Sequence, residues 1–318
     1  MAIIGKDIKR AQEFLNNGQL VAIPTETVYG LAGNALDESA VLSIFETKKR
    51  PSFDPLIVHT DSLEKLEQYV LEIPDKAFLL AKAFWPGPLT LLLPKKIIIP
   101  DLVTSGLDTV AVRIPNHALT LELLTGLDFP LAAPSANPFG YISPTSAQHV
   151  SQQLGDEIPY ILDGGACGIG IESTIVGFID GITTIYRLGG LAVETIENVV
   201  GEVSLMPHSS SNPQAPGMLK SHYAPRKPFY LKDRSSILSL GNENSGYLLY
   251  DHYLDGIDRK YQRLLSPKGD LKEAAHNLFA YLRALDAEPL DQIYGEFVPD
   301  INLGRAINDR LKRAAAID

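Results

Sequence analysis

The chain has 318 residues, of which 45% are hydrophobic and 21% are charged, a composition typical of a soluble globular protein rather than a disordered one. The formal net charge of -10 argues against stable, standalone binding of tRNA or DNA, because an acidic protein repels phosphate backbones on average. The single cysteine, Cys167, excludes an intrachain disulfide and fits a reducing compartment, so we expect a cytoplasmic protein. No apolar run reaches the ~18 residues of a membrane span, and no membrane association is expected.

Short apolar runs alternate with helical patterns as far as about residue 205, which predicts an α/β domain. Helices are predicted from Lys6 to Asn17, from an Asp37 cap through Phe45, and from Asp61 onward. The predicted strands are Leu20–Ile23, Leu56–His59, Leu89–Leu93, Thr109–Arg113, Leu131–Ala133, Thr174–Phe178 and Thr183–Arg187. Many of these runs are continuously apolar, so at least one face of the sheet is expected to be covered.

Residues 206–228 have the composition of a linker, with several prolines and a run of three serines. A plain spacer would not need the four larger side chains in this stretch, which are Met218, Leu219, His222 and Tyr223. Beyond it, strands are predicted at Phe229–Leu231 and Tyr247–Tyr250, and helices at Leu271–Leu285 and Leu303–Ala316. We therefore expect a first domain of residues 1–205 and a smaller α/β domain of residues 229–318.

Five polar clusters in the first domain could carry chemistry, and each also has a structural explanation. Thr25 and Thr27 flank a glutamate just after a strand, where α/β proteins place ligands, but such threonines often only satisfy backbone groups. Lys48 and Arg50 end a predicted helix, where they could either stabilise the helix dipole or clamp a phosphate.

The remaining clusters are two loops and a turn. Ser135 and Asn137 follow a strand and suit ribose or phosphate oxygens, although turns before proline commonly contain the same residues. The glycine-rich segment 163–174 lets backbone N–H groups approach an anion, but its spacing is neither a dinucleotide fingerprint nor a P-loop. Cys167 within it is interpreted as an inert small residue, and the turn from Trp85 to Pro88 as structural.

Two arginines stand at the ends of apolar strands. Arg113 follows Val110–Val112, and Arg187 follows Thr184–Tyr186. An arginine in that position is costly to desolvate unless it meets an anion. Two of them beside the polar clusters favour a common anionic ligand.

Taken in order along the chain, these segments closely resemble the YrdC-type threonylcarbamoyl-AMP synthases, in their long two-domain form. The matching segments are Pro24–Gly30, Lys48–Pro51, Pro86–Pro88, Arg113, Ser135–Asn137, Glu172–Thr174, Arg187, Pro216–Pro225 and Leu303–Leu311. The resemblance implies a YrdC-like fold, with a twisted, open, mixed sheet, flanking helices and a deep cleft. It also implies a smaller, Rossmann-like α/β domain at the C-terminal end, with the linker covering the active site.

The resemblance further implies the activity of an L-threonylcarbamoyladenylate synthase, a nucleotidyltransferase. Such an enzyme forms threonylcarbamoyl-AMP and pyrophosphate from L-threonine, bicarbonate or CO2, and ATP, for the threonylcarbamoyladenosine modification of tRNA. A downstream tRNA threonylcarbamoyl-transfer enzyme would receive the product. ATP is thus expected as a substrate, with Mg²⁺ on its phosphates for reasons of charge. The sequence names no ligands for that metal.

The same resemblance assigns residues to the two substrates. Those expected around ATP are Lys48, Arg50, Thr109, Ser135, Asn137, Ser143, Arg187 and Tyr223, with Lys48 and Arg50 also expected to be catalytic. Those expected around L-threonine are Thr27, His59, Arg113, the backbone of Ala133, and Ser173. Two positions depart from the family pattern, since Asp54 replaces a common asparagine and Lys49 a frequent glycine. The charge of Asp54 would repel a triphosphate unless a cation or base intervenes.

Two other hypotheses compete with this one. The first is a double-stranded RNA or tRNA-binding module, which the net charge and the lack of a basic run with interleaved aromatic residues count against. The second is a carbamoyl-transfer enzyme of the hydrogenase-maturation type. Those enzymes need zinc-binding cysteine pairs, which a chain with one cysteine cannot supply.

Overall fold

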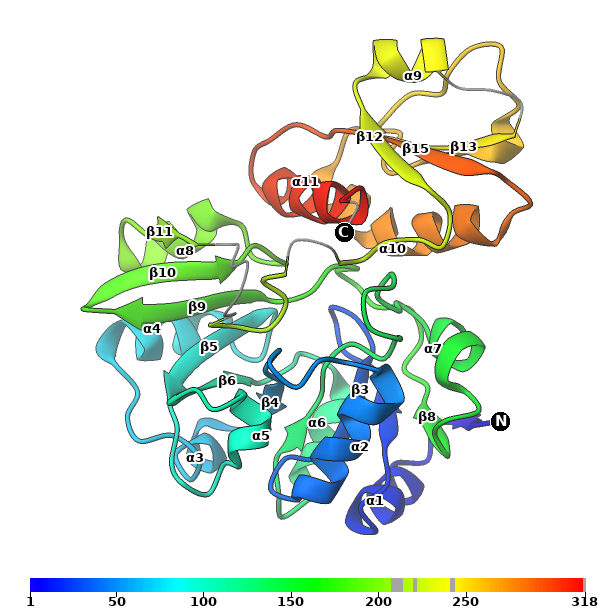
Figure 1. Ribbon diagram of the computed structural model, residues 1–318. Coiled ribbons are helices and arrows are strands. Elements are labelled where there is room, and N and C mark those ends of the chain that lie inside the picture. Colours follow the sequence, from blue (N-terminus) through cyan, green and yellow to red (C-terminus); the bar gives the residue numbers. More distant parts are fainter. Residues whose placement is uncertain (207–213, 220–221, 241–243, 317–318) are drawn as a thin grey trace.

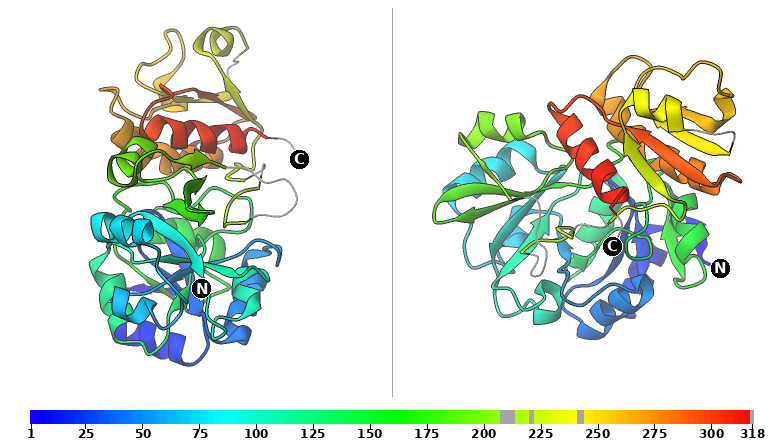
Figure 2. Two further views of the ribbon diagram at one scale, coloured as in Figure 1. Left: turned by 90° about the vertical axis from the view of Figure 1, so that its left-hand side faces the viewer. Right: turned by 45° about the horizontal axis from the view of Figure 1, so that its top comes forward.

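A computed structural model describes residues 1–206, 214–219, 222–240 and 244–316. Within these residues the chain forms two β-sheets, each flanked by helices and each belonging to its own domain (Figure 1). The two domains are stacked, and α10 (Leu271–Ala287) and α11 (Leu303–Ala314) of the second domain lie between its sheet and the first domain (Figures 1 and 2).

The large sheet is mixed and has 11 strands within the described residues, in the order β1-β8-β2-β3-β7-β4-β6-β5-β9-β10-β11. In chain order the strands are β1 (Ile3–Gly5), β2 (Val21–Ile23), β3 (Gly30–Asn34), β4 (Ile57–His59), β5 (Leu89–Pro94), β6 (Thr109–Arg113), β7 (Leu131–Ala132), β8 (Tyr160–Leu162), β9 (Thr174–Ile179), β10 (Ile182–Arg187) and β11 (Ser204–Leu205). For example, β6 runs parallel to β4 and antiparallel to β5. The mixed sheet with flanking helices confirms the predicted fold class.

Polar caps begin several helices of the first domain. The helices are α1 (Ile8–Asn16), α2 (Glu38–Lys48), α3 (Leu63–Leu66), α4 (Asp75–Phe84), α5 (Asp101–Thr104), α6 (Ala118–Thr125), α7 (Ala147–Leu154) and α8 (Val193–Val200). Asp37 caps α2 as predicted, accepting a hydrogen bond from the backbone N of Ser39 at 2.9 Å. The start predicted at Asp61 is wrong by one residue, because the side chain of Ser62 accepts the bond from Lys65 instead.

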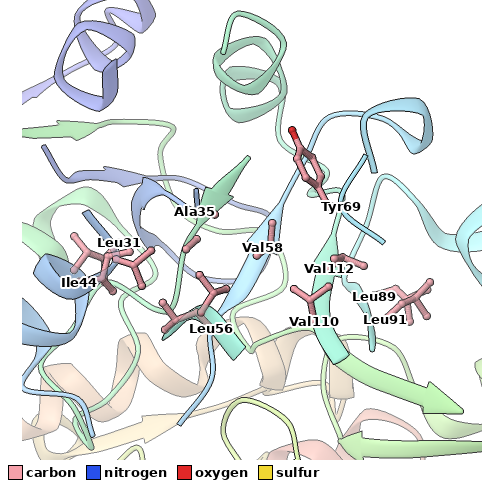
Figure 3. Packing of buried hydrophobic residues seen from close by; sticks show 14 of the residues in the cluster. Leu31, Ala35, Ile44, Leu56, Val58, Tyr69, Leu89, Leu91, Val110 and Val112 are labelled. Carbon is pink, nitrogen blue, oxygen red and sulfur yellow. The ribbon is translucent and has the colours of Figure 1, made fainter. Parts of the chain in front are cut away.

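The main core lies between the large sheet and its helices (Figure 3). Leu31 on β3 and Ile44 on α2 pack together at one end of the view, and Leu89 on β5 lies near Val112 on β6 at the other. Val58 on β4 connects the two groups, and all five side chains are buried. Burial of this kind contributes about 1.5–3 kcal/mol to folding stability for each large aliphatic side chain. This packing holds in place the strands whose ends form the site.

The second domain is a parallel α/β unit. Its strands are β12 (Phe229–Lys232), β13 (Ser245–Leu249), β14 (Gln262–Leu264) and β15 (Gln292–Glu296), in the order β12-β15-β13-β14, and all neighbours are parallel. The remaining helices are α9 (Arg234–Leu240), α10, α11 and a short 3-10 turn at Arg259–Tyr261. A parallel sheet with helical connections agrees with the predicted Rossmann-like domain.

The two domains share buried contacts. Val28, Ile142 and Ile171 of the first domain pack in one apolar cluster with the second domain's own core residues, including Leu278. Arg283 of α10 is buried and donates hydrogen bonds to the carbonyl oxygens of Ser143, at 3.1 Å, and Ile142. Because the cluster and the hydrogen bonds cross the boundary, the second domain is fixed against the wall of the first.

Candidate active site

A cleft with about 580 Å³ of empty volume, its open mouth included, lies where several strands of the large sheet end. The side chains around it come from segments far apart in the sequence. They are Thr25, Thr27, Val28, Gly30, Arg50, Pro55, Ile57, His59, Arg113, Ala133, Pro134, Ser135, Glu172, Ser173, Arg187, Pro216, Gly217, His222 and Tyr223. Nine of the residues expected to bind substrates are in this set, namely Thr27, Arg50, His59, Arg113, Ala133, Ser135, Ser173, Arg187 and Tyr223.

The turn after β2 is held by its own hydroxyl groups. The Thr25 hydroxyl donates to the carbonyl of Val28 at 2.7 Å and accepts from the backbone N of Thr27 at 3.1 Å. Its oxygen also lies 2.8 Å from the hydroxyl of Thr27. The Thr25 hydroxyl therefore satisfies the hydrogen bonds of backbone groups in the turn, which is the structural role considered for it above. The turn places Thr27 in the wall of the cleft.

Arg113 and His59 are cross-strand partners at the ends of β6 and β4. Arg113 is buried; its Nε donates to the carbonyl of Gly87 at 3.2 Å and its Nη2 lies 2.7 Å from a carboxylate oxygen of Glu26. Burial and then the charge of Arg113 lower the pKa of His59 to about 3, so its imidazole is neutral at pH 7. The pair offers a fixed cation beside a neutral hydrogen-bonding group.

Arg50 lines the cleft and Lys48 lies just behind it. The guanidinium of Arg50 donates to the carbonyls of Asp54 and Pro55, at 3.0 and 2.8 Å, and forms an ion pair with the Asp54 carboxylate at 2.9 Å. Arg50 is thus the cation that offsets the negative charge of Asp54, which would otherwise repel a triphosphate. Lys48 is buried, and its Nζ donates to the carbonyls of Ser135 and Asn137, both at 2.5 Å. Lys48 connects the end of α2 to the loop that carries Ser135.

The buried position of Lys48 affects its pKa. Desolvation, and then the nearby charge of Arg50, lower the pKa of Lys48 well below its usual value. An anion bound in the cleft would act in the opposite direction and raise that pKa.

The other residues expected around ATP lie at different depths. Asn137 donates to the carbonyls of Pro138 and Tyr141, both at 2.8 Å, and Ser143 donates to Glu172 at 2.5 Å. Both are buried behind the lining rather than in it. Thr109 is half-buried at the start of β6, whereas Arg113 ends the same strand, so Thr109 does not line the cleft.

Arg187 connects the end of β10 to the residues around it. Its Nε and Nη2 donate to the carbonyl and hydroxyl oxygens of Ser173 at 3.1 and 3.0 Å, and its Nη1 donates to the carbonyl of Pro216 at 3.5 Å. Burial lowers the pKa of Arg187 to about 10, which leaves it protonated at pH 7. The arginine is therefore a charged group that also contacts the linker.

Among the described residues of the linker, four line the cleft: Pro216, Gly217, His222 and Tyr223. Ala215 and Met218 are fully buried, in an apolar cluster with Ile57, Leu92, Ala111, Ile175 and Tyr186 of the large sheet. The backbone N of Gly217 donates to Asp54 at 3.3 Å. Lys220 and Ser221 of the predicted linker motif lie outside the described residues.

Gly217 needs to be glycine for two reasons. Its φ of +75° is a conformation that other residues rarely adopt, and a Cβ atom there would lie 3.2 Å from Nη1 of Arg187. The glycine thus lets the linker backbone approach the cleft arginine.

Glu172 lines the cleft, although no role of its own was predicted for it. Burial alone would raise its pKa, but the charges of Arg310 and Arg187 overcome that effect and the pKa is lowered. Its partner Arg310, in α11, donates to it at 2.9 Å. The signal available in the sequence was the position of Glu172 directly before Ser173, and that of Arg310 in the segment matching the family's C-terminal end.

Two segments have the structural roles expected of them. Burial raises the pKa of Cys167 to about 12, which makes a reactive thiolate unfavourable near neutral pH. The indole N–H of Trp85 donates to the carbonyl of Leu89 at 2.7 Å, so the tryptophan fixes the turn before β5.

No group of three or more His, Cys, Asp or Glu side chains in the described part of the chain could hold a metal ion. Over the same residues, every helix is too short or too polar to cross a membrane.

Comparisons with known proteins cover both domains. Residues 13–189 match the Sua5/YciO/YrdC family, described as "Telomere recombination", and residues 191–316 match a family described as "Threonylcarbamoyl-AMP synthase, C-terminal domain". The chain is a member of the Sua5/YrdC family of threonylcarbamoyl-AMP synthases.

Relatives within this family match at nearly full length. The chain is 41% identical to the threonylcarbamoyl-AMP synthase of Pyrococcus abyssi, over 97% of this chain and 94% of the relative. It is 40% identical to that of Bacillus subtilis, over 97% and 92%. The solved structure of P. abyssi Sua5 complexed with L-threonine superimposes with a TM-score of 0.91 at 40% identity, covering 99% of this chain and 97% of that one.

Proposed function

We propose that this chain is an L-threonylcarbamoyladenylate synthase, which converts L-threonine, bicarbonate or CO2, and ATP into threonylcarbamoyl-AMP and pyrophosphate. The observation that carries the proposal is the convergence of Arg50, Arg113 and Arg187 in one cleft. Arg50 and Arg113 already form ion pairs with Asp54 and Glu26, whereas Arg187, within the described residues, donates only to uncharged oxygens. A buried arginine without a carboxylate partner favours an anionic ligand. ATP would supply that anion, and relatives that match nearly the whole chain are named for this reaction.

Two adjoining parts of the cleft are proposed to bind the two substrates. Thr27, His59, Arg113, the Ala133 backbone and Ser173 would hold L-threonine, with Arg113 pairing with its carboxylate. Arg50, Ser135, Arg187 and Tyr223 would contact ATP directly. Lys48, Asn137 and Ser143 would act one contact away, and their burial behind the lining supports this indirect role. Thr109 lies outside the lining, so its expected contact with ATP stays a prediction.

The proposed reaction needs no enzyme nucleophile. The threonine amine either adds to CO2 and loses a proton or condenses with bicarbonate and releases water, and both routes give a carbamate. A carbamate oxygen then attacks the α-phosphorus of ATP as the bond to pyrophosphate breaks. The protein would position the reactants and stabilise the charge that develops on the phosphates, chiefly through Arg50 and Arg187. The inert environment of Cys167 agrees with such a mechanism.

Magnesium is proposed to enter with ATP rather than to occupy a protein site. The cleft carboxylates are already paired, Asp54 with Arg50 and Glu172 with Arg310. No described cluster of carboxylates and histidines could hold the ion by itself. When bound, the metal would neutralise phosphate charge.

The linker is proposed to shield the product from water. Threonylcarbamoyl-AMP is readily hydrolysed, and a segment that covers the cleft would slow that loss. The contacts of Gly217 with Asp54, and of Pro216 with Arg187, support this role. We assign residues 1–205 to the catalytic domain, 206–228 to the linker and 229–318 to the second domain.

The product is proposed to pass, in the cytoplasm, to a tRNA threonylcarbamoyl-transfer enzyme. Stable binding of nucleic acid by this chain alone is not expected, because its net charge is -10.

Pyrophosphate release with single amino acids tests the proposal. With ATP, bicarbonate and Mg²⁺, we expect release that depends on L-threonine and falls by about tenfold or more for valine, which lacks the hydroxyl, and for serine, which lacks the methyl group. Arg50→Ala should lose the activity, while Lys232→Ala, an exposed lysine of the second domain, should keep it. Equal release with all amino acids, or full activity of Arg50→Ala, would remove the proposed site.

A further inference from the structure

The ring of Tyr223 packs against its neighbour His222, with ring centroids 4.2 Å apart, and against the second domain. It stacks on Phe279 of α10 with centroids 5.5 Å apart and an interplanar angle of 29°. The guanidinium carbons of Arg310 and Arg313, in α11, lie 5.0 and 4.8 Å from its centroid. Both distances lie within the ~6 Å range of cation–π attraction. A residue that lines the first domain's cleft is therefore packed against three side chains of the other domain.

The backbone of Tyr223 shows why this support matters. Its φ of +67° lies in the left-handed region, which is unfavourable for a large side chain. Residues persist in such conformations only where the surrounding structure holds them. The next residue, Ala224, is fixed by a hydrogen bond from its N to the carbonyl of Gly140 at 2.8 Å. The side chain itself has to be held by its packing.

Arg313 has few partners other than this ring. It is 3% exposed, and its Nη1 lies 3.6 Å from the carboxylate of Asp309, which pairs more closely with Arg310 at 2.6 Å. Its Nε and Nη2 find no hydrogen-bond acceptor in the described residues. Unpaired N–H groups on a buried guanidinium cost folding free energy. The contact of Arg313 with the Tyr223 ring is the interaction that offsets part of this cost.

Arg310 connects the same helix to the cleft wall. Its Nε donates to Glu172 at 2.9 Å and its Nη2 to the carbonyl of Leu188 at 2.8 Å. These bonds fix α11 relative to Ser173, the residue after Glu172. The position of the helix, and with it that of the Tyr223 ring, is thereby coupled to the geometry of the cleft.

We propose that the second domain is a positioning element of the nucleotide site, in which Phe279, Arg310 and Arg313 hold Tyr223 over the cleft. The inference rests on the proposed contact of Tyr223 with ATP. The three residues act through Tyr223 and need not touch the nucleotide. The ring is in place only while α10 and α11 are docked, so the catalytic domain depends on its neighbour for ATP binding.

A double-mutant cycle tests the proposal with ATP affinity measured by calorimetry, without turnover. Arg313→Gln should weaken ATP binding by roughly five- to thirtyfold, the size of a desolvated cation–π contact. In the Tyr223→Ala background the same substitution should cause no further loss, because the residue acts through the ring. Affinity for L-threonine should stay unchanged. Lys312→Gln, an exposed neighbour on the same helix, is the matched control and should change nothing.

A readout without nucleotide separates this proposal from the proposed activity. Exchange of the Ala224 amide hydrogen should accelerate in Arg313→Gln but not in Lys312→Gln, whether or not the chain proves to be a synthase. Arg313→Lys, which keeps the cation, should retain most of the ATP affinity. Should Arg313→Gln fail to fold, Phe279→Leu replaces it in the cycle.

Two results would overturn the positioning role. One is wild-type ATP affinity and amide exchange in both folded variants, Arg313→Gln and Phe279→Leu. The other is a loss in the double variant equal to the product of the single losses, which would mean that Arg313 contacts the nucleotide independently of Tyr223.

Discussion

The pair of Arg50 and Asp54 explains how an acidic side chain fits beside a proposed triphosphate site. Asp54 is fully buried, and it also accepts the backbone N–H of Gly217 at 3.3 Å. The carboxylate therefore serves two functions, since it neutralises the cleft arginine and holds the linker. Lys49, at φ +52° and exposed, adopts the left-handed conformation that suits the glycine frequent there.

Asp54→Asn should free Arg50 to interact with ATP. Without ligand, we expect the variant to lose about 1–3 kcal/mol of stability, because a buried arginine loses its counter-charge. With ATP, the nucleotide should replace that charge, so the gain in melting temperature should exceed that of the wild type. An equal gain in both proteins, measured by thermal unfolding with and without ATP, would show that Asp54 does not compete for Arg50.

His59 makes stability depend on pH. Its folded pKa of about 3 is below the unfolded value of 6.5, so the unfolded chain binds the proton first. The contribution is complete above pH 6.5 and is lost as pH falls toward 3. At pH 5 the stability lost in this way, relative to neutral pH, amounts to about 2 kcal/mol. Denaturant titrations at pH 7 and pH 5 should show a smaller difference for His59→Gln than for the wild type, and an identical difference would contradict this origin.

Two kinds of interaction, apolar packing and a hydrogen bond, attach the linker to the first domain. Met218 and Ala215 fill an apolar hollow formed by β4, β5, β6, β9 and β10, while the Gly217 amide forms a polar bond next to them. The sequence of the linker contains four side chains that a plain spacer would not need, Met218, Leu219, His222 and Tyr223. Met218 is one of the residues that attach the segment, whereas the roles of Ala215 and of the Gly217 amide had no signal in the composition.

Met218→Ala should loosen the linker locally without unfolding the domains. The loss of a buried methionine is worth about 2–5 kcal/mol in a core. We therefore expect exchange of the Gly217 amide hydrogen to accelerate at least tenfold. Leu205→Ala, at a half-exposed position, is the matched control and should leave that amide unchanged. Unchanged exchange in Met218→Ala would mean that the hydrogen bond to Asp54 alone holds the segment.

In the molecule as a whole, the predictions from sequence were most accurate where a charged residue ends an apolar strand. The apolar run before Arg113 predicted both β6 and a cation at its end, and the same reasoning placed Arg187. Helix α6 was missed because its sequence is apolar without helical periodicity. The contact between Glu172 and Arg310 joins residues 138 positions apart, and local spacing carries no information about it. The position of Lys48 behind the cleft lining also depends on tertiary packing, so it could not be predicted from the sequence.

One cleft is proposed to bring ATP, an amino acid and a one-carbon unit together. The direct test is incubation of the full chain with ATP, Mg²⁺, ¹³C-bicarbonate and L-threonine, followed by mass spectrometry of the nucleotide products. We predict an adenylate that contains both threonine and the labelled carbon, formed only when all three substrates are present and absent with Arg50→Ala. Pyrophosphate release without labelled adenylate, or an adenylate of threonine lacking the labelled carbon, would contradict the account.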